Sequence, residues 1–155
     1  DFINLDQCMQ ALHKTGAYAF YLGCGRHLVT VPPSVPLSNG IYAWDFRNAS
    51  EGWQEPNQWD LALYRKSDLK DHFLKWSYQD LPSLEAYWRK ATPSNQIGLY
   101  FEQSKMVHLP INVGYLTTED LLAKFIQGFK INIDPLFKVE NLALSIDLIP
   151  EFINR

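Results

Sequence analysis

A cysteine between two glycines, followed by two basic residues, is the first arrangement in this chain that could do nucleophilic chemistry. In "LGCGRH", residues 22–27, Cys24 has glycine on each side, and Arg26 and His27 come two and three positions later. Neighbouring positive charge stabilises a thiolate and lowers its pKa, which makes a cysteine nucleophilic. Residues at this spacing reach a thiol only in certain turns, however. We therefore favour a glycine-bracketed turn that lets the preceding strand leave its sheet.

A second arrangement lies in "LSNGIYAWDFRNASEGW", residues 37–53. Here Gly40-Ile41-Tyr42 is followed by Ala43-Trp44-Asp45 and, a few residues on, by an alanine. This run resembles the second sequence block of the ADP-ribosyltransferase family, which reads Gly-Phe-Tyr, then small or hydroxyl residues, then a helix beginning near an alanine. The resemblance implies an NAD cofactor, with Tyr42 stacking on the nicotinamide ring and Gly40 beside it.

The first block of that family reads Tyr-His-Gly-Thr in one branch and uses an arginine in the other. The nearest match here is Tyr21-Leu22-Gly23-Cys24, which has leucine where the ribose-binding histidine would be. The resemblance therefore implies that Arg26 holds the NAD, although it follows the expected strand.

A carboxylate is the remaining requirement of this chemistry. Breaking the bond between ribose and nicotinamide creates an oxocarbenium-like centre, which a nearby carboxylate stabilises. Glu102, in "LYFEQS" on an expected strand, is the best-placed candidate for the catalytic glutamate. A simpler interpretation, which we favour, is that Tyr42 and Trp44 have a structural role in packing. Two positions apart on a strand, they would share a face and pack against a helix.

Several other kinds of site have no motif in this chain. It has no Gly-rich phosphate loop and no Gly-x-Ser-x-Gly elbow. The four histidines, His13, His27, His72 and His108, are far apart in sequence, so we expect no metal site. The two cysteines, Cys8 and Cys24, are expected to be reduced and partly buried.

Composition and charge restrict the partners. The chain has 155 residues, 46% of them hydrophobic, and a net charge of -3 with the two signs interspersed. Without a basic stripe, nucleic acid is not expected as a partner. No apolar run is long enough to cross a bilayer, and no secretory signal is visible, so a cytoplasmic location is expected. We interpret residues 1–155 as a single globular domain, and leave open its excision from a larger protein.

The elements that would position these residues follow from periodicity and turn signals. Helices are expected at 4–16, at 67–77 with Ser67 as the cap, at 81–91 and at 117–129, where Thr117 and Asp120 approximate a capping box. Strands are expected at 17–23, 27–31, 41–46, 59–64, 96–103, 105–116 and in the tail from 141 to Pro150. The proline-rich run 32–40 is expected to be a loop that closes on a tight turn, and 48–53 a helical turn capped by Asn48.

Strands and helices do not alternate strictly in this order. The pattern predicts an α+β fold with a mixed or mostly antiparallel sheet of about six strands, flanked by about four helices.

Two classes of function remain open. The first is a non-catalytic protein-binding domain, such as an immunity or inhibitor protein or an effector recognition module. The absence of a catalytic constellation favours it, and the chain is rich in the aromatic residues that anchor interfaces. The candidate anchors are Trp44, Trp53, Trp59, Trp76 and Trp88. No cofactor is expected in that case. The alternative is the NAD-dependent ADP-ribosyltransferase-like toxin or effector domain described above.

Overall fold

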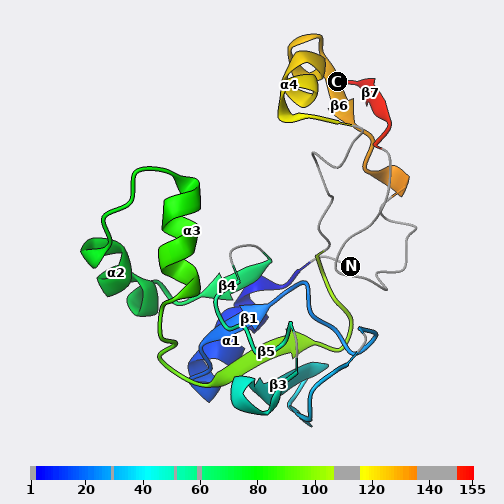
Figure 1. The fold of residues 1–155 in the computed structure, drawn as a ribbon. Helices are drawn as coiled ribbons and strands as arrows, with labels where there is room; N and C mark the ends of the chain where they lie inside the picture. The colour runs from blue at the N-terminus through cyan, green and yellow to red at the C-terminus, as the bar shows by residue number, and fades with distance from the viewer. Residues whose placement is uncertain (1–2, 29, 51, 59–60, 107–115, 136–149) are drawn as a thin grey trace.

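The computed structural model describes residues 3–28, 30–50, 52–58, 61–106, 116–135 and 150–155 (Figure 1). Within these ranges the order of elements is α1 (Leu5–Thr15), β1 (Ala19–Tyr21), β2 (Ser34–Pro36), β3 (Ile41–Asp45), a 3-10 turn (Phe46–Asn48), β4 (Ala62–Tyr64), α2 (Lys66–Lys75), α3 (Leu81–Arg89), β5 (Ile97–Phe101), α4 (Thr118–Ile126), β6 (Phe129–Ile131) and β7 (Phe152–Asn154).

The main sheet has five strands in the order β2-β3-β5-β1-β4. Its β1 and β5 run parallel, and the other neighbours are antiparallel. A second sheet pairs β6 with β7. The predicted α+β class with a mixed sheet is confirmed, although the strands of the described residues are divided between two sheets. The single-domain organisation stays a prediction.

The two faces of the main sheet carry different cores. Phe20 and Leu99, which are paired in register across β1 and β5, belong to a cluster of mainly aliphatic residues with two phenylalanines under α1. Tyr21 and Tyr100, one residue further along each strand, belong to an aromatic cluster on the opposite face. Successive side chains of a strand point to opposite faces, so one pair of buried strands supplies both cores.

Helix α1 agrees with its predicted span and has both of its caps. The side chain of Asn4 accepts a hydrogen bond from the backbone N–H of Gln7 at 3.0 Å. At the other end Gly16 adopts a left-handed conformation, with φ of 68°, and its N–H donates to the carbonyl of Leu12. Its apolar stripe buries Cys8 and Leu12 against the sheet.

The prediction for 27–40 was wrong in two places. Residues 27, 28, 30 and 31 are in turns, a bend and irregular backbone instead of a strand, because the N–H of Leu28 donates to the carbonyl of Gly25 and Thr30 has a positive φ of 65°. The proline-rich run, expected as a loop, contains β2. Proline fits there because β2 is an edge strand of the sheet. The tight turn that follows is confirmed at Asn39 and Gly40, both with positive φ.

Two other caps differ from the prediction. In place of the helical turn expected at 48–53 with Asn48 as its cap, a 3-10 turn spans Phe46–Asn48, capped by the side chain of Asp45 through the N–H of Arg47, and a separate turn follows in which the N–H of Trp53 donates to the carbonyl of Ser50. Helix α2 begins at Lys66, and its cap position, Arg65 rather than Ser67, makes no side-chain cap bond.

The helix predicted at 81–91 is confirmed as α3. It begins with a capping box between Asp80 and Ser83. One of its residues, Trp88, is buried, and the ring of Trp88 meets that of Tyr64 on β4 at 5.0 Å. The indole nitrogen of Trp88 also donates to the carbonyl of Gln58. This contact attaches the helix pair α2–α3 to the edge of the main sheet (Figure 1).

Helix α4 has the predicted capping box, in which Thr117 and Asp120 bond each other's backbone N–H groups. Strand β6, which was not predicted, pairs with β7 after Pro150. The strand expected at 105–116 lies outside the described residues except at its ends, and so does the tail strand before Pro150.

Candidate functional site

The structure brings together the four residues that the family resemblance selected. The hydroxyl of Tyr42 lies 3.4 Å from Oε1 of Glu102, a long hydrogen bond. The N–H of Glu102 donates to the carbonyl of Gly40 at 2.8 Å. Register explains this meeting: Tyr42 pairs with Tyr100 across β3 and β5, so the residues just beyond each strand end also meet. Glu102 itself lies one residue past β5 rather than on it.

Arg26 completes this group. Its N–H donates to the carbonyl of Glu102 at 2.8 Å, and its guanidinium carbon lies 4.9 Å from the centre of the Tyr42 ring. A guanidinium at this distance is attracted by the negative face of the ring. The face of the Tyr42 ring is therefore already occupied by the guanidinium of Arg26, which a nicotinamide ring would have to displace in order to stack there.

Tyr42 is half-buried at the border of the aromatic core. The ring of Tyr100 lies 5.6 Å from it, and the hydroxyl of Tyr100 shares a 2.8 Å hydrogen bond with Ser34. Burial raises the pKa of Tyr100, an effect that the bond to Ser34 and the nearby charge of Arg26 oppose. The Tyr100 phenol is therefore neutral at physiological pH.

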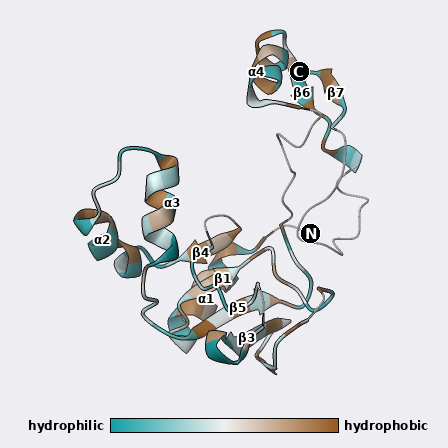
Figure 2. Ribbon diagram, in the orientation of Figure 1, coloured by the Kyte–Doolittle hydropathy of each residue, from teal (hydrophilic) through white to brown (hydrophobic). Residues whose placement is uncertain are grey.

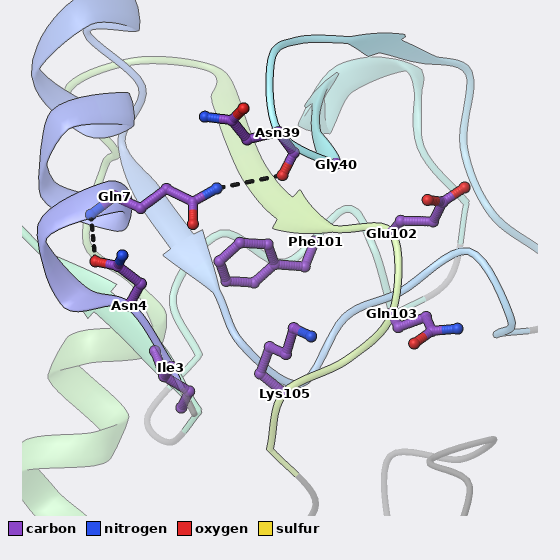
Figure 3. A pocket seen from close by; sticks show the side chains of 9 residues that line it. All are labelled: Ile3, Asn4, Gln7, Asn39, Gly40, Phe101, Glu102, Gln103 and Lys105. Atoms are coloured by element: carbon purple, nitrogen blue, oxygen red, sulfur yellow. Dashed lines mark hydrogen bonds between the residues drawn. The ribbon is translucent and has the colours of Figure 1, made fainter. Parts of the chain in front are cut away.

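A cavity of about 500 Å³ opens beside this group (Figure 3). Glu102 and Gly40 line it, but Tyr42 and Arg26 are not among its lining residues. Most of the other walls carry amide or charged side chains around the ring of Phe101, and the lining residues are Ile3, Asn4, Gln7, Asn39, Gly40, Phe101, Glu102, Gln103 and Lys105. Such a cavity can form hydrogen bonds with a small polar ligand.

The hypothesis of a nucleophilic Cys24 was wrong, and the glycine-bracketed turn explains the segment. Cys24 is 4% exposed, and burial raises the pKa of its thiol to about 12, so it stays protonated. Gly25 is required sterically, because a Cβ there would lie 2.7 Å from the backbone nitrogen of Ser104. Within the described residues Cys8 and Cys24 are both free thiols, as expected, but they are almost fully rather than partly buried.

His27 beside this turn is partly buried, and burial lowers its pKa. Among the residues that the structure describes, no three His, Cys, Asp or Glu side chains gather as a metal site would require. In the same part of the chain, none of the helices has the length and apolarity needed to traverse a bilayer.

The tryptophans proposed as interface anchors have mostly structural roles. Trp44, Trp53 and Trp88 are buried in the aromatic core, and Trp59 lies outside the described residues. Trp76 is less buried: it packs against the border of the aromatic core at the end of α2, and its ring stacks on Tyr87 of α3 at 5.9 Å with 15° between the planes.

Around Trp76 several large apolar side chains are exposed. Leu74 is 74% exposed, Tyr78 44%, Leu81 59% and Tyr87 40%. Leu74 lies near the end of α2, Tyr78 in the connection, Leu81 at the start of α3 and Tyr87 near its end, and Figure 2 shows hydrophobic residues in brown on both helices. We call Leu74, Trp76, Tyr78, Leu81 and Tyr87 the helix-pair surface. The helical periodicity pointed to an apolar face on α2, but nothing in the sequence showed that this end of the pair would be uncovered.

Comparison with known proteins adds no relative to these observations. No family model matches the chain, and neither a curated protein nor a solved structure matches it significantly.

Proposed function

We propose that this chain is a non-catalytic protein-binding domain, of the kind found in immunity or inhibitor proteins and effector recognition modules, and that its contact surface is the helix-pair surface. One observation supports this most: within the described residues, α2 contains no buried residue, while large apolar side chains around its end stand open to solvent. Clustered exposed apolar groups on a folded protein mark sites of association.

The chemistry of these side chains suits an interface. Tyr and Trp bury much area on binding and lose little conformational entropy, because each has two rotatable side-chain bonds. Here the rings also hold one another in place: Trp76 contacts Phe73 at 5.5 Å and His72 at 5.2 Å, besides stacking on Tyr87. A surface that is ordered before binding reduces the entropy lost in the complex.

Site-specific photocrosslinking tests this proposal. A benzophenone amino acid placed at Leu74 or Leu81 is expected to give one discrete adduct with another protein in cells of the source. Matched controls are Val35 on β2 and Met9 on α1, which are 64% and 56% exposed and lie on other elements. Adducts of equal yield from all four positions, or none from the helix pair, would contradict the proposal.

A second candidate function rests on a different observation, the meeting of Tyr42, Arg26 and Glu102. In the ADP-ribosyltransferase-like alternative, Glu102 would stabilise the oxocarbenium-like centre formed when the ribose–nicotinamide bond breaks. Tyr42 would stack on the nicotinamide, a cationic ring that could replace the guanidinium of Arg26. Support for this candidate is the 3.4 Å approach of the phenol to the carboxylate.

Thermal unfolding with NAD tests this candidate. A ligand that binds only the folded state at a hundredfold excess over its Kd adds about 2.7 kcal/mol to the free energy of unfolding. If the candidate is right, NAD raises the Tm and nicotinamide is released. Glu102→Gln should abolish the release, whereas Glu55→Gln, a change to an exposed glutamate elsewhere, should not. A Tm that NAD leaves unchanged would eliminate the NAD-dependent reaction.

A further inference from the structure

A groove along α2 shows which kind of partner this domain would recognise. It has a volume of about 390 Å³ and is lined by Tyr64, Lys66, Leu69, Lys70, Phe73 and Leu74. Tyr64 ends β4, an edge strand of the main sheet, and the other five residues belong to α2. Leu74 is shared with the helix-pair surface, so the groove continues that surface along the helix.

The five residues from α2 occupy one side of the helix. At about 100° per residue they fall within roughly 140° of its circumference. Leu69 and Phe73, one turn apart, supply the apolar part of this side, and Lys66 and Lys70, also one turn apart, supply two ammonium groups. Lysine stems contribute apolar surface while their charged ends remain at the border in contact with water.

The two carboxylates of α2 lie away from this side. Asp68 and Asp71 fall outside the arc of the groove residues, and neither lines the groove. Asp68 is engaged elsewhere: it accepts from Arg65 at 2.7 Å and from Ser94 at 2.9 Å. The groove therefore has an apolar floor and a basic border with no acid in its lining, although the whole chain has a net charge of -3.

We propose that this groove binds an amphipathic helix of the partner protein, whose apolar stripe is bordered by carboxylates one helical turn apart. The apolar stripe would lie on Leu69, Phe73 and Leu74, as in other helix-in-groove complexes. The two carboxylates would match the one-turn spacing of Lys66 and Lys70, since opposite charges at an interface select the partner and fix its register. This inference rests on the proposed protein-binding function and specifies its partner.

Synthetic peptides test the inference with the intact protein. The probe is a fluorescein-labelled amphipathic helical peptide with Leu and Phe along one stripe and Glu on both borders. Companion peptides carry Gln or Lys at the border positions. Fluorescence anisotropy should give the tightest binding for the Glu peptide, about tenfold weaker binding for the Lys peptide and intermediate binding for the Gln peptide. The difference should shrink as salt is added.

The matched variants are charge reversals. Lys66→Glu with Lys70→Glu should invert the order of the peptides, and Lys14→Glu with Lys130→Glu, exposed lysines on α1 and β6, should leave it unchanged. Glutamate is tolerated at position 66, in the first turn of α2, where the helix dipole favours negative charge, and position 70 lies one turn further along the helix. If the reversal nevertheless unfolds the protein, Lys66→Gln with Lys70→Gln should remove the preference without inverting it.

Three results would overturn the inference. The first is equal affinity for all three peptides, and the second is an equal loss from the control reversal. The third is binding to phosphatidylserine–phosphatidylcholine vesicles that Lys66→Glu with Lys70→Glu abolishes, which would assign the groove to an anionic membrane surface. If a partner is crosslinked from Leu74 but the peptides show no charge preference, the protein-binding function is supported and the inference of an acidic helix is overturned. A peptide charge preference without a partner crosslinked from Leu74 would contradict the proposed protein-binding function, even though the groove selects acidic helices.

Discussion

Replacing Trp44 with alanine is expected to lower the free energy of unfolding by about 3–5 kcal/mol, the usual cost of deleting a large buried aromatic side chain. Trp44 is 2% exposed, and its ring lies within contact of four others, those of Tyr21, Phe46, Trp53 and Tyr100, at 5.0–5.5 Å between centres. Its indole nitrogen also donates to the carbonyl of Trp53 at 3.0 Å. Removing the side chain leaves a cavity where three segments of the chain meet.

Urea denaturation followed by circular dichroism measures this loss. Trp44→Phe is the partial control, because it keeps a ring but leaves the carbonyl of Trp53 without its donor; a smaller cost of about 1–3 kcal/mol is expected. Leu74→Ala is the surface control, with a still smaller cost, because Leu74 is 74% exposed. A loss below about 1 kcal/mol for Trp44→Ala would show that the aromatic core is not packed around this residue.

Replacing Asn57 with alanine is expected to cost about 1–3 kcal/mol, because the buried hydroxyl of Tyr18 is left without a partner, whereas the part-buried carbonyl of Ala91 can bond water instead. Asn57 is 9% exposed, accepts from the hydroxyl of Tyr18 at 2.7 Å and donates to the carbonyl of Ala91 at 2.6 Å. Ala91 follows α3 closely. One amide thus ties the loop before β4 and the end of the helix pair to the core.

A double-mutant cycle isolates the bond to Tyr18. Tyr18 is 1% exposed, and burial, with a smaller contribution from the charge of Asp68, raises the pKa of its phenol, so the hydroxyl is a donor at any physiological pH. Asn57→Ala should cost less free energy of unfolding when Tyr18→Phe is already present, because no hydroxyl is then left unpaired. Strictly additive losses would mean that the two side chains do not interact.

The sequence predicted the elements with clear periodicity or caps. Helices α1 and α4 followed from apolar residues three and four positions apart between recognisable end signals, and β1, β3 and β5 from short aromatic or aliphatic runs. The secondary-structure prediction failed where contacts with distant parts of the chain determine the backbone conformation. Pro36 was read as a loop residue, but an edge strand accepts proline because its free side needs no donor. Positive φ at Thr30 is likewise invisible in its residue type.

The candidate site was predictable in its members but not in its arrangement. The resemblance to a known family selected Gly40, Tyr42, Arg26 and Glu102, and the register of β3 against β5 accounts for their meeting. No signal in the sequence indicated that the guanidinium of Arg26 lies over the Tyr42 ring, or that Tyr42 is not among the residues lining the cavity. The helix-pair surface was hidden for another reason: periodicity identifies an apolar face, but whether another element covers that face depends on the whole fold.

The central claim, that the helix-pair surface binds another protein, is tested most directly by the affinity of the partner crosslinked at Leu74 for purified variants. Truncating a side chain that is a hot spot costs about 2 kcal/mol or more of binding free energy, and about 1.4 kcal/mol is already tenfold in Kd. Leu74→Ala and Leu81→Ala, at side chains that are 74% and 59% exposed, should each weaken binding about tenfold without lowering the Tm, while Val35→Ala on β2 should leave the affinity unchanged. Unchanged affinity in both helix-pair variants would contradict the account.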